Sequence, residues 1–175
     1  CAKVYAFEIT RNYRESYDMF ACTGILFNHE SPRRGLEFVT RKVTMTAARI
    51  AHGFDECLWI GNVEAKRDWG FAGDFVEAMH MMLQQKEPGD YVVCTAIQHS
   101  INELLTIAFK TAGIDNWEQY VESDPRYKRP AEVFALHGSY AKAKEKLGWE
   151  PKTKFEDMIS FMVKEDIRRL SHDLR

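Results

Sequence analysis

The sequence lacks most of the short motifs that mark a self-sufficient catalytic or metal site. It contains no G-x-G-x-x-G or G-x-x-G-x-x-G segment, and therefore no glycine-rich phosphate cradle for a dinucleotide. It also has no H-E-x-x-H motif and no G-x-S-x-G elbow. The four cysteines form no C-x-x-C pair, and the six histidines do not pair at metal-ligand spacing. We therefore expect no metal site.

Long apolar runs and a strong charge of one sign are also missing. No run approaches the length of a membrane span, so no membrane partner is expected. The formal net charge is -2, which gives no overall positive field for a nucleic acid. Cys22, Cys57 and Cys94 stand among apolar neighbours, where a free thiol acts as a small core residue. Free thiols of this kind favour a reducing cytoplasm as the compartment.

Helical and strand-like patterns alternate along the chain. A four-residue spacing of Tyr5, Ile9, Tyr13 and Tyr17 predicts a first helix over residues 3–17. Apolar runs predict short strands at 20–27, 57–60 and 91–95, the first of them buried. Further helices are predicted at 38–52, from about 75 to an end near 88–89, and at 101–109, 140–147 and 155–169. This alternation is typical of an α/β fold with crossover connections, and we expect residues 1–175 to form one compact unit.

Turn and cap residues set several of these boundaries. Gly53 and Gly148 each follow a helical pattern and predict its C-terminal end. Ser100 and Thr153 each begin a capping box, in which a glutamate three residues later bonds back to the first backbone N–H.

The strongest candidate site is the polar segment over residues 28–35, which follows a predicted strand directly. Ligands of α/β sheets bind where strand ends open into loops. Asn28, His29, Ser31, Arg33 and Arg34 supply several hydrogen-bond donors for an anionic ligand. The alternative is a solvated polar turn.

Three other segments carry charged groups in suitable positions. Lys42 lies near the start of a helix, where backbone N–H groups also favour anions. Arg67, in the loop 61–70, could form a fork onto phosphate oxygens, oriented by Asp68 or Glu64. Arg129 and Glu132 could hold a phosphate and a pair of sugar hydroxyls. Each segment could instead be an ordinary charged surface turn.

In order and spacing these segments resemble the extended short-chain dehydrogenase/reductase family, and within it the GDP-mannose 4,6-dehydratases. The resemblance rests on the segments 24–35, 38–42 and 61–70, and continues through 127–133 and 147–151. It implies the C-terminal part of such an enzyme, namely the end of a Rossmann-type domain and the small substrate-binding domain. Residues 1 to about 30 would be the last helix and strand region of the nucleotide-binding domain, and the remainder mostly the nucleotide-sugar-binding part.

The resemblance implies an NADP-dependent lyase that converts GDP-mannose to GDP-4-keto-6-deoxymannose, the precursor of GDP-fucose. In the family, a hydride leaves sugar C4, water is lost across C5 and C6, and the hydride returns to C6. A tyrosine base acts with a lysine four residues later, and Lys3 matches that lysine. The tyrosine would stand two positions before Cys1, and the catalytic threonine and glutamate would lie further upstream. We therefore expect the chain on its own to be inactive.

The same resemblance implies roles for particular residues. Lys3, His29 and Arg34 would contact NADP, and Lys3 would also be catalytic. The GDP part of the substrate would be lined by Asn28, Val39, Lys42 and Arg67, with Arg129 and Glu132 at its remote phosphate-ribose end. Family members form homodimers or homotetramers, with the first helix at a subunit contact.

Two other functions fit the sequence. A nucleotide-sugar epimerase or reductase would use the same scaffold. A truncated, non-catalytic nucleotide-sugar-binding or structural remnant would need none of the upstream residues. In either case we expect the isolated chain to expose apolar surface and to be marginally stable.

Overall fold

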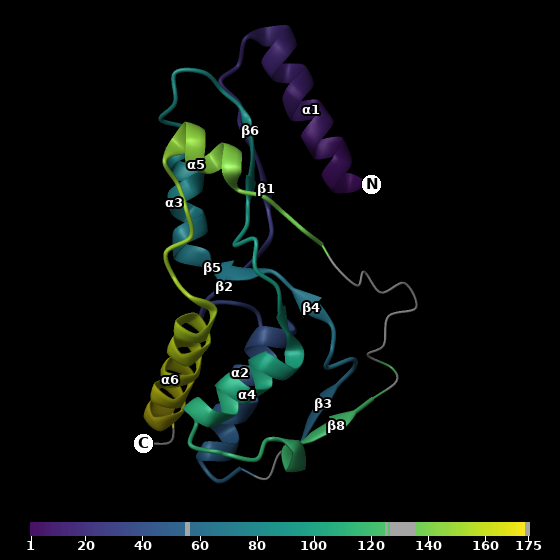
Figure 1. The fold of residues 1–175 in the computed structure, drawn as a ribbon, viewed down its shortest axis with the longest axis vertical. Coiled ribbons are helices and arrows are strands. Elements are labelled where there is room, and N and C mark those ends of the chain that lie inside the picture. The colour runs from purple at the N-terminus through teal and green to yellow at the C-terminus, as the bar shows by residue number, and fades with distance from the viewer. Residues whose placement is uncertain (55–56, 125, 127–135, 174–175) are drawn as a thin grey trace.

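The computed structural model describes residues 1–54, 57–124, 126 and 136–173 (Figure 1). Helices and short strands alternate along it, as the sequence predicts. The elements are α1 (Ala2–Tyr17), β1 (Thr23–Leu26), β2 (Asn28–Glu30), α2 (Val39–Ala51), β3 (Leu58–Ile60), β4 (Lys66–Arg67), β5 (Trp69–Phe71), α3 (Ala72–Met82), β6 (Asp90–Val93), β7 (His99–Ser100), α4 (Ile101–Thr111), the 3-10 turn η1 (Glu118–Tyr120), β8 (Val121–Ser123), α5 (Ala141–Leu147) and α6 (Phe155–Asp173).

The strands pair in twos within the described part of the chain. β1 runs parallel to β6, with Thr23 opposite Asp90 and Leu26 opposite Val93. β2 is parallel to β5, and β3 is parallel to β8, whereas β4 and β7 are antiparallel. Parallel partners require long crossover connections, and here these contain helices. The α/β prediction is confirmed.

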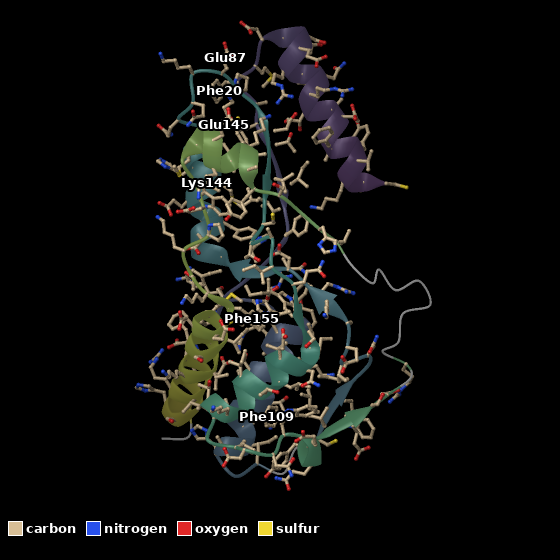
Figure 2. The ribbon with its side chains drawn as sticks, viewed as in Figure 1. Phe20, Glu87, Phe109, Lys144, Glu145 and Phe155 are labelled. Atoms are coloured by element: carbon tan, nitrogen blue, oxygen red, sulfur yellow. The ribbon has the colours of Figure 1, made fainter. Side chains whose placement is uncertain are left out.

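Two hydrophobic clusters form the core of the described residues. One joins α2, α4 and α6 to β3, and its buried members include Val43, Phe109 and Ile159. The other joins α3, α5 and β6, with Phe75, Val93 and Trp149 at its centre. Figure 1 shows the two groups at successive levels of an elongated molecule, with β2 and β5 between them. In Figure 2, Phe109 lies beside α4 in the lower part of the molecule and Phe155 at the upper end of α6, near mid-height, both below Phe20 and Glu87.

A buried segment connects the two levels. The indole N–H of Trp149 donates to the Asp74 carbonyl over 2.8 Å. The Asp74 carboxylate accepts bonds from the backbone N–H groups of Lys152 and Thr153. Asp74 on α3 therefore fixes the turn that leads from α5 into α6.

The first helix forms as predicted but has no buried residue. Val4, Tyr5 and Tyr17 are each about two-thirds exposed, at 65%, 69% and 67%. Arg14 links the helix to the rest of the molecule, because its guanidinium makes two bonds to Asp90, of 2.9 and 2.8 Å. Arg14 also donates to the carbonyl of Ala21. The apolar surface expected for the isolated chain is therefore present along α1.

Several local predictions are confirmed and others are wrong. Ser100 and Glu103 form the predicted capping box, and Gly53 and Gly148 adopt positive φ angles of 83° and 70°. The prediction of a second capping box at Thr153 is wrong. Helix α6 begins at Phe155, and the Thr153 hydroxyl donates to Asp74 instead of capping the helix.

The first strand was predicted to be buried and is not. Ile25 is 45% exposed and Phe20 46% exposed, whereas Cys22, Leu26 and Phe27 pack against the core, so the run from 20 to 27 is only partly covered. The polar segment 28–35 was expected to be a loop but begins with strand β2, and the loop 61–70 contains β4 and the start of β5. Cys94 is buried as predicted, whereas Cys57 is exposed.

Gly70 in β5 is a position where the backbone approaches a core ring closely. An added Cβ would lie 2.9 Å from Phe75 Cζ, closer still to Phe75 Cε2, and 3.1 Å from Thr95 Cγ2. We expect Gly70→Ala to reduce the free energy of unfolding by about 1–3 kcal/mol, measured by denaturant titration. The same change made in a Phe75→Leu background should cost much less. Equal costs in the two backgrounds would contradict this explanation.

Candidate functional site

A pocket of about 520 Å³ opens between the start of α2 and the segment from β3 to β4. Five residues predicted to bind ligand line it together: Asn28, Arg34, Val39, Lys42 and Arg67. Glu30, Phe38, Thr40, Trp59, Asn62 and Arg126 are among its other lining residues. Asn28 and Arg67, 39 positions apart in the sequence, therefore meet in one concave site.

Strand β2 contributes Asn28 and Glu30 to the pocket lining. β2 pairs with β5, which places Asn28 opposite Trp69 and Glu30 opposite Phe71. A tight turn follows, in which the Arg34 N–H donates to the Ser31 carbonyl over 3.0 Å. This turn carries Arg34 back toward the start of α2.

Glu30 is a buried carboxylate at the base of this region, only 2% exposed. Burial raises the pKa of its carboxyl, although the Thr40 hydroxyl, which donates to it over 2.5 Å, acts in the opposite direction. Arg34 Nε lies 3.3 Å from the same carboxylate. The guanidinium of Arg34 also stacks 3.6 Å above the Phe38 ring. Glu30 therefore links β2 to the turn through an ion pair with Arg34 and to α2 through the hydrogen bond from Thr40.

The opposite wall of the pocket carries two more cations. Lys42 Nζ donates to the Trp59 carbonyl over 2.7 Å, which draws the ammonium toward β3. Arg67 lies on β4, and its Nη1 donates to the Lys66 carbonyl over 2.7 Å. With Arg34 they give the pocket a cationic lining suited to an anionic ligand.

Asp68 was predicted to orient Arg67, but its recorded hydrogen bonds go to other residues. It is buried, and its oxygens accept bonds from the backbone N–H and hydroxyl of Thr95 and from the Ala96 N–H. These bonds stabilise the turn after β6, where Ala96 has a positive φ of 63°. The other proposed orienting group, Glu64, is exposed.

Two predicted cofactor residues lie outside this pocket. The His29 ring stacks on Phe75, with its Nδ1 2.8 Å from the Phe27 carbonyl. A carbonyl only accepts, so Nδ1 carries a hydrogen, and in the neutral ring Nε2 is then the acceptor nitrogen. Lys3 is exposed on α1. Arg129 and Glu132 fall outside the residues that the structure describes.

Comparison with known proteins gives the family. The sequence model of GDP-mannose 4,6 dehydratase matches residues 1–162. The chain belongs to the GDP-mannose 4,6 dehydratase family. The predicted resemblance is thereby confirmed.

Curated relatives extend over nearly the whole chain. GDP-mannose 4,6 dehydratase 2 of Arabidopsis thaliana is 55% identical over 166 residues, which cover 95% of this chain and 44% of the relative. The Homo sapiens GDP-mannose 4,6 dehydratase is 45% identical, covering 95% of this chain and 49% of the relative. The chain thus spans about half the length of these relatives.

Solved structures confirm the fold. RMD from Pseudomonas aeruginosa, complexed with NADPH, superposes with a TM-score of 0.84 at 21% identity, covering 95% of this chain and 55% of that one. The dTDP-glucose 4,6-dehydratase from Bacillus anthracis, in complex with NAD, gives 0.79 at 17% identity, with coverage of 95% and 50%. The chain therefore shares its α/β architecture with about half of each of these two structures.

The described residues were also compared with the requirements of a membrane span and of a metal site. None of the helices found there is both long and apolar enough to cross a membrane. No three histidine, cysteine, aspartate or glutamate residues among them are grouped to hold a metal ion.

Sequence reasoning missed Glu30, Phe38 and Arg126 as pocket residues. Glu30 stands between His29 and Ser31 in the strongest candidate segment, but a glutamate in a polar run gives no sign of burial. Arg126 directly precedes the predicted segment 127–133. Its guanidinium is paired with Asp124, whose carboxyl pKa it lowers.

Thr40 allows a test of the buried carboxylate. Thr40→Val removes the hydroxyl that bonds to ionised Glu30, and should cost about 1–3 kcal/mol of unfolding free energy at neutral pH. The bond favours the ionised carboxylate, so the cost should shrink as the pH falls through the raised pKa of Glu30. Denaturant unfolding across pH 4–8 measures this. Thr46→Val, at another buried threonine of α2, should show no such pH dependence, and a constant cost for Thr40→Val would contradict the assignment.

Proposed function

We propose that the complete polypeptide, meaning the protein at the length of its relatives, converts GDP-mannose to GDP-4-keto-6-deoxymannose with NADP. This chain supplies the GDP-sugar pocket and the lysine of the Tyr-x-x-x-Lys pair, Lys3. The observation that carries the proposal is the convergence of five predicted ligand residues on one pocket, in a member of the GDP-mannose 4,6 dehydratase family.

The pocket chemistry supports a nucleoside diphosphate. Arg67 and Lys42 contact the diphosphate in this proposal, with Asn28 and Val39 beside it. The start of α2 adds to this, because no side chain caps its N-terminus and its first backbone N–H groups favour an anion. Arg129 and Glu132 hold the remote phosphate-ribose end, with the carboxylate accepting from ribose hydroxyls. Such remote contacts position the reacting sugar.

NADP supplies hydride acceptance and return when it is bound, and the residues present suit it. Arg34 Nε faces the buried Glu30 carboxylate at 3.3 Å, while the side chain lines the pocket, so the terminal N–H groups of its guanidinium can donate to a phosphate. The fixed ring of His29 offers Nε2 as an acceptor. Lys3 places an ammonium four residues beyond the catalytic tyrosine. These residues bind and orient, and Lys3 favours the ionised form of that tyrosine.

The organisation of the complete protein is part of the proposal. Residues 1 to about 30 belong to the nucleotide-binding domain, and the pairing of β1 with β6 supports placing α3, β6 and α5 beside them. The exposed apolar side chains of α1 support a subunit contact in a homodimer or homotetramer. The free thiols support a cytoplasmic location.

Product analysis tests the activity directly. The complete polypeptide, incubated with GDP-mannose and NADP, should give a nucleotide sugar lighter by one water, identified by mass spectrometry. An epimerase would leave the mass unchanged, and a reductase, in a parallel incubation with NADPH, would add two hydrogens. Either of those products would overturn the dehydratase assignment.

A non-catalytic binding remnant is the remaining alternative, because Lys3 alone cannot perform the reaction. The intact mass and N-terminal sequence of the natural polypeptide separate the two. A natural chain of roughly twice this length, with a glycine-rich loop and a tyrosine two positions before Cys1, supports the enzyme. A natural chain that starts near Cys1 leaves only binding.

A further inference from the structure

Two arginines donate hydrogen bonds to backbone carbonyls of the turn over residues 31–34. Arg169 Nη1 on α6 donates to the Pro32 carbonyl over 2.8 Å. Arg41 Nε on α2 donates to the Arg34 carbonyl over 3.1 Å. Pro32 is buried and the Arg169 side chain is 39% exposed, so this contact is partly shielded from solvent. Two backbone carbonyls of one short turn are thus each bound by a guanidinium from a helix.

Each of these arginines is in turn fixed by a carboxylate of α6. Arg169 Nε lies 2.8 Å from Glu165 Oε1. Arg41 Nη1 is paired with Asp166, which has no exposed surface. Glu165 and Asp166 are adjacent, so one turn of α6 orients both arginines. Residues 165–169 lie beyond the 1–162 matched by the family model.

We propose that Arg169 and Arg41 are positioning residues, which hold the 31–34 turn against α6 and so set where Arg34 presents its guanidinium. The proposal rests on the assignment of Arg34 to the cofactor under the proposed function. Arg34 itself is otherwise restrained by stacking on Phe38 and by the charge of Glu30.

The geometry explains why α6, which contributes no residue to the pocket lining, should influence binding there. The turn carries no regular secondary structure between Glu30 and Val39, so its backbone depends on such side-chain contacts. A guanidinium bound to a carbonyl and a carboxylate together is restrained in two directions. Loss of the contact would let the turn move, and the Arg34 side chain with it.

Arg168 provides a matched control for Arg169. It is the preceding residue of α6 and bonds to the same Glu165 carboxylate, at 2.8 and 2.9 Å. Its side chain is 60% exposed, and the bonds recorded for it lead to Glu165 rather than to the turn. Arg168→Ala therefore removes an arginine from Glu165 and leaves the contact between Arg169 and Pro32 in place.

The test compares NADPH affinity in variants of the complete polypeptide by fluorescence titration. Arg169→Ala should weaken NADPH binding by roughly tenfold, which corresponds to the loss of one charge-assisted hydrogen bond. Arg168→Ala should leave it within about twofold. The Arg34→Ala/Arg169→Ala double variant should bind no more weakly than Arg34→Ala alone, since the effect of Arg169 passes through Arg34. Amide hydrogen exchange at residues 31–36 should increase in Arg169→Ala but not in Arg168→Ala.

Equal NADPH affinities for Arg169→Ala and Arg168→Ala would overturn the proposal, as would a further tenfold loss on adding Arg169→Ala to Arg34→Ala. The second result would assign Arg169 a general structural role. If the wild-type polypeptide binds NADPH without dehydrating GDP-mannose, the proposed function fails while the affinity comparison still decides this inference. Absence of NADPH binding by the wild type would overturn both.

Discussion

Replacing Arg67 by alanine is expected to weaken GDP-mannose binding to the complete polypeptide by roughly a hundredfold. A guanidinium can make two parallel bonds to phosphate oxygens, and alanine removes both. Lys42→Ala should cost roughly tenfold or less, because an ammonium acts as a point charge. The Lys42 ammonium is also shared with the Trp59 carbonyl. Isothermal titration with GDP-mannose measures both losses under one set of conditions.

Two further variants sharpen this comparison. Arg67→Lys keeps the charge but not the fork, and should recover only part of the lost affinity. Glu64→Gln alters an exposed charge on the neighbouring loop and should leave affinity within about twofold. Equal losses for Arg67→Ala and Lys42→Ala would count against the assignment of Arg67 to the diphosphate.

The largest effect on stability is expected at the buried pair between α2 and α6. Asp166→Ala leaves the guanidinium of Arg41, only 4% exposed, without its carboxylate. We expect a loss of about 3–5 kcal/mol in the free energy of unfolding, because an uncompensated charge is then buried. Denaturant unfolding of the complete polypeptide, followed by hydrogen exchange in α2 and α6, measures the loss.

Removing both partners separates the cost of an unpaired charge from the loss of packing. The double replacement Arg41→Met/Asp166→Leu should recover much of the stability lost in Asp166→Ala, since apolar side chains of similar volume can fill the same space. A double variant less stable than either single variant would contradict this account.

The sequence predicted the helices better than the strands, and the reason is physical. A helix repeats its apolar positions over several turns and ends at recognisable residues, such as Gly53, Gly148 and the Ser100 cap. β2 and β4 have only three and two residues, too few for any period. Their pairing depends on where distant partners lie. The exposure of Ile25 in β1 depends likewise on which elements cover it.

The candidate site was predictable where its chemistry is local. Arg34, Lys42 and Arg67 are cations after strands or at a helix start, and the family resemblance assigned Arg34 to NADP and Lys42 and Arg67 to the GDP part of the substrate. The contacts of α6 that hold the 31–34 turn and α2 in place were not predictable. The contact between Arg169 and Pro32 joins residues 137 positions apart, and the pair of Arg41 and Asp166 joins residues 125 apart. Such partners become visible only once α6 is packed against α2.

A crystal structure of the complete polypeptide with GDP-mannose bound is the most direct test of the central claim, that the pocket beside α2 is the GDP-sugar site. The account predicts the diphosphate in contact with Arg67 and Lys42, near the first backbone N–H groups of α2. A diphosphate bound elsewhere, with Arg67 and Lys42 making no contact to the nucleotide, would contradict it.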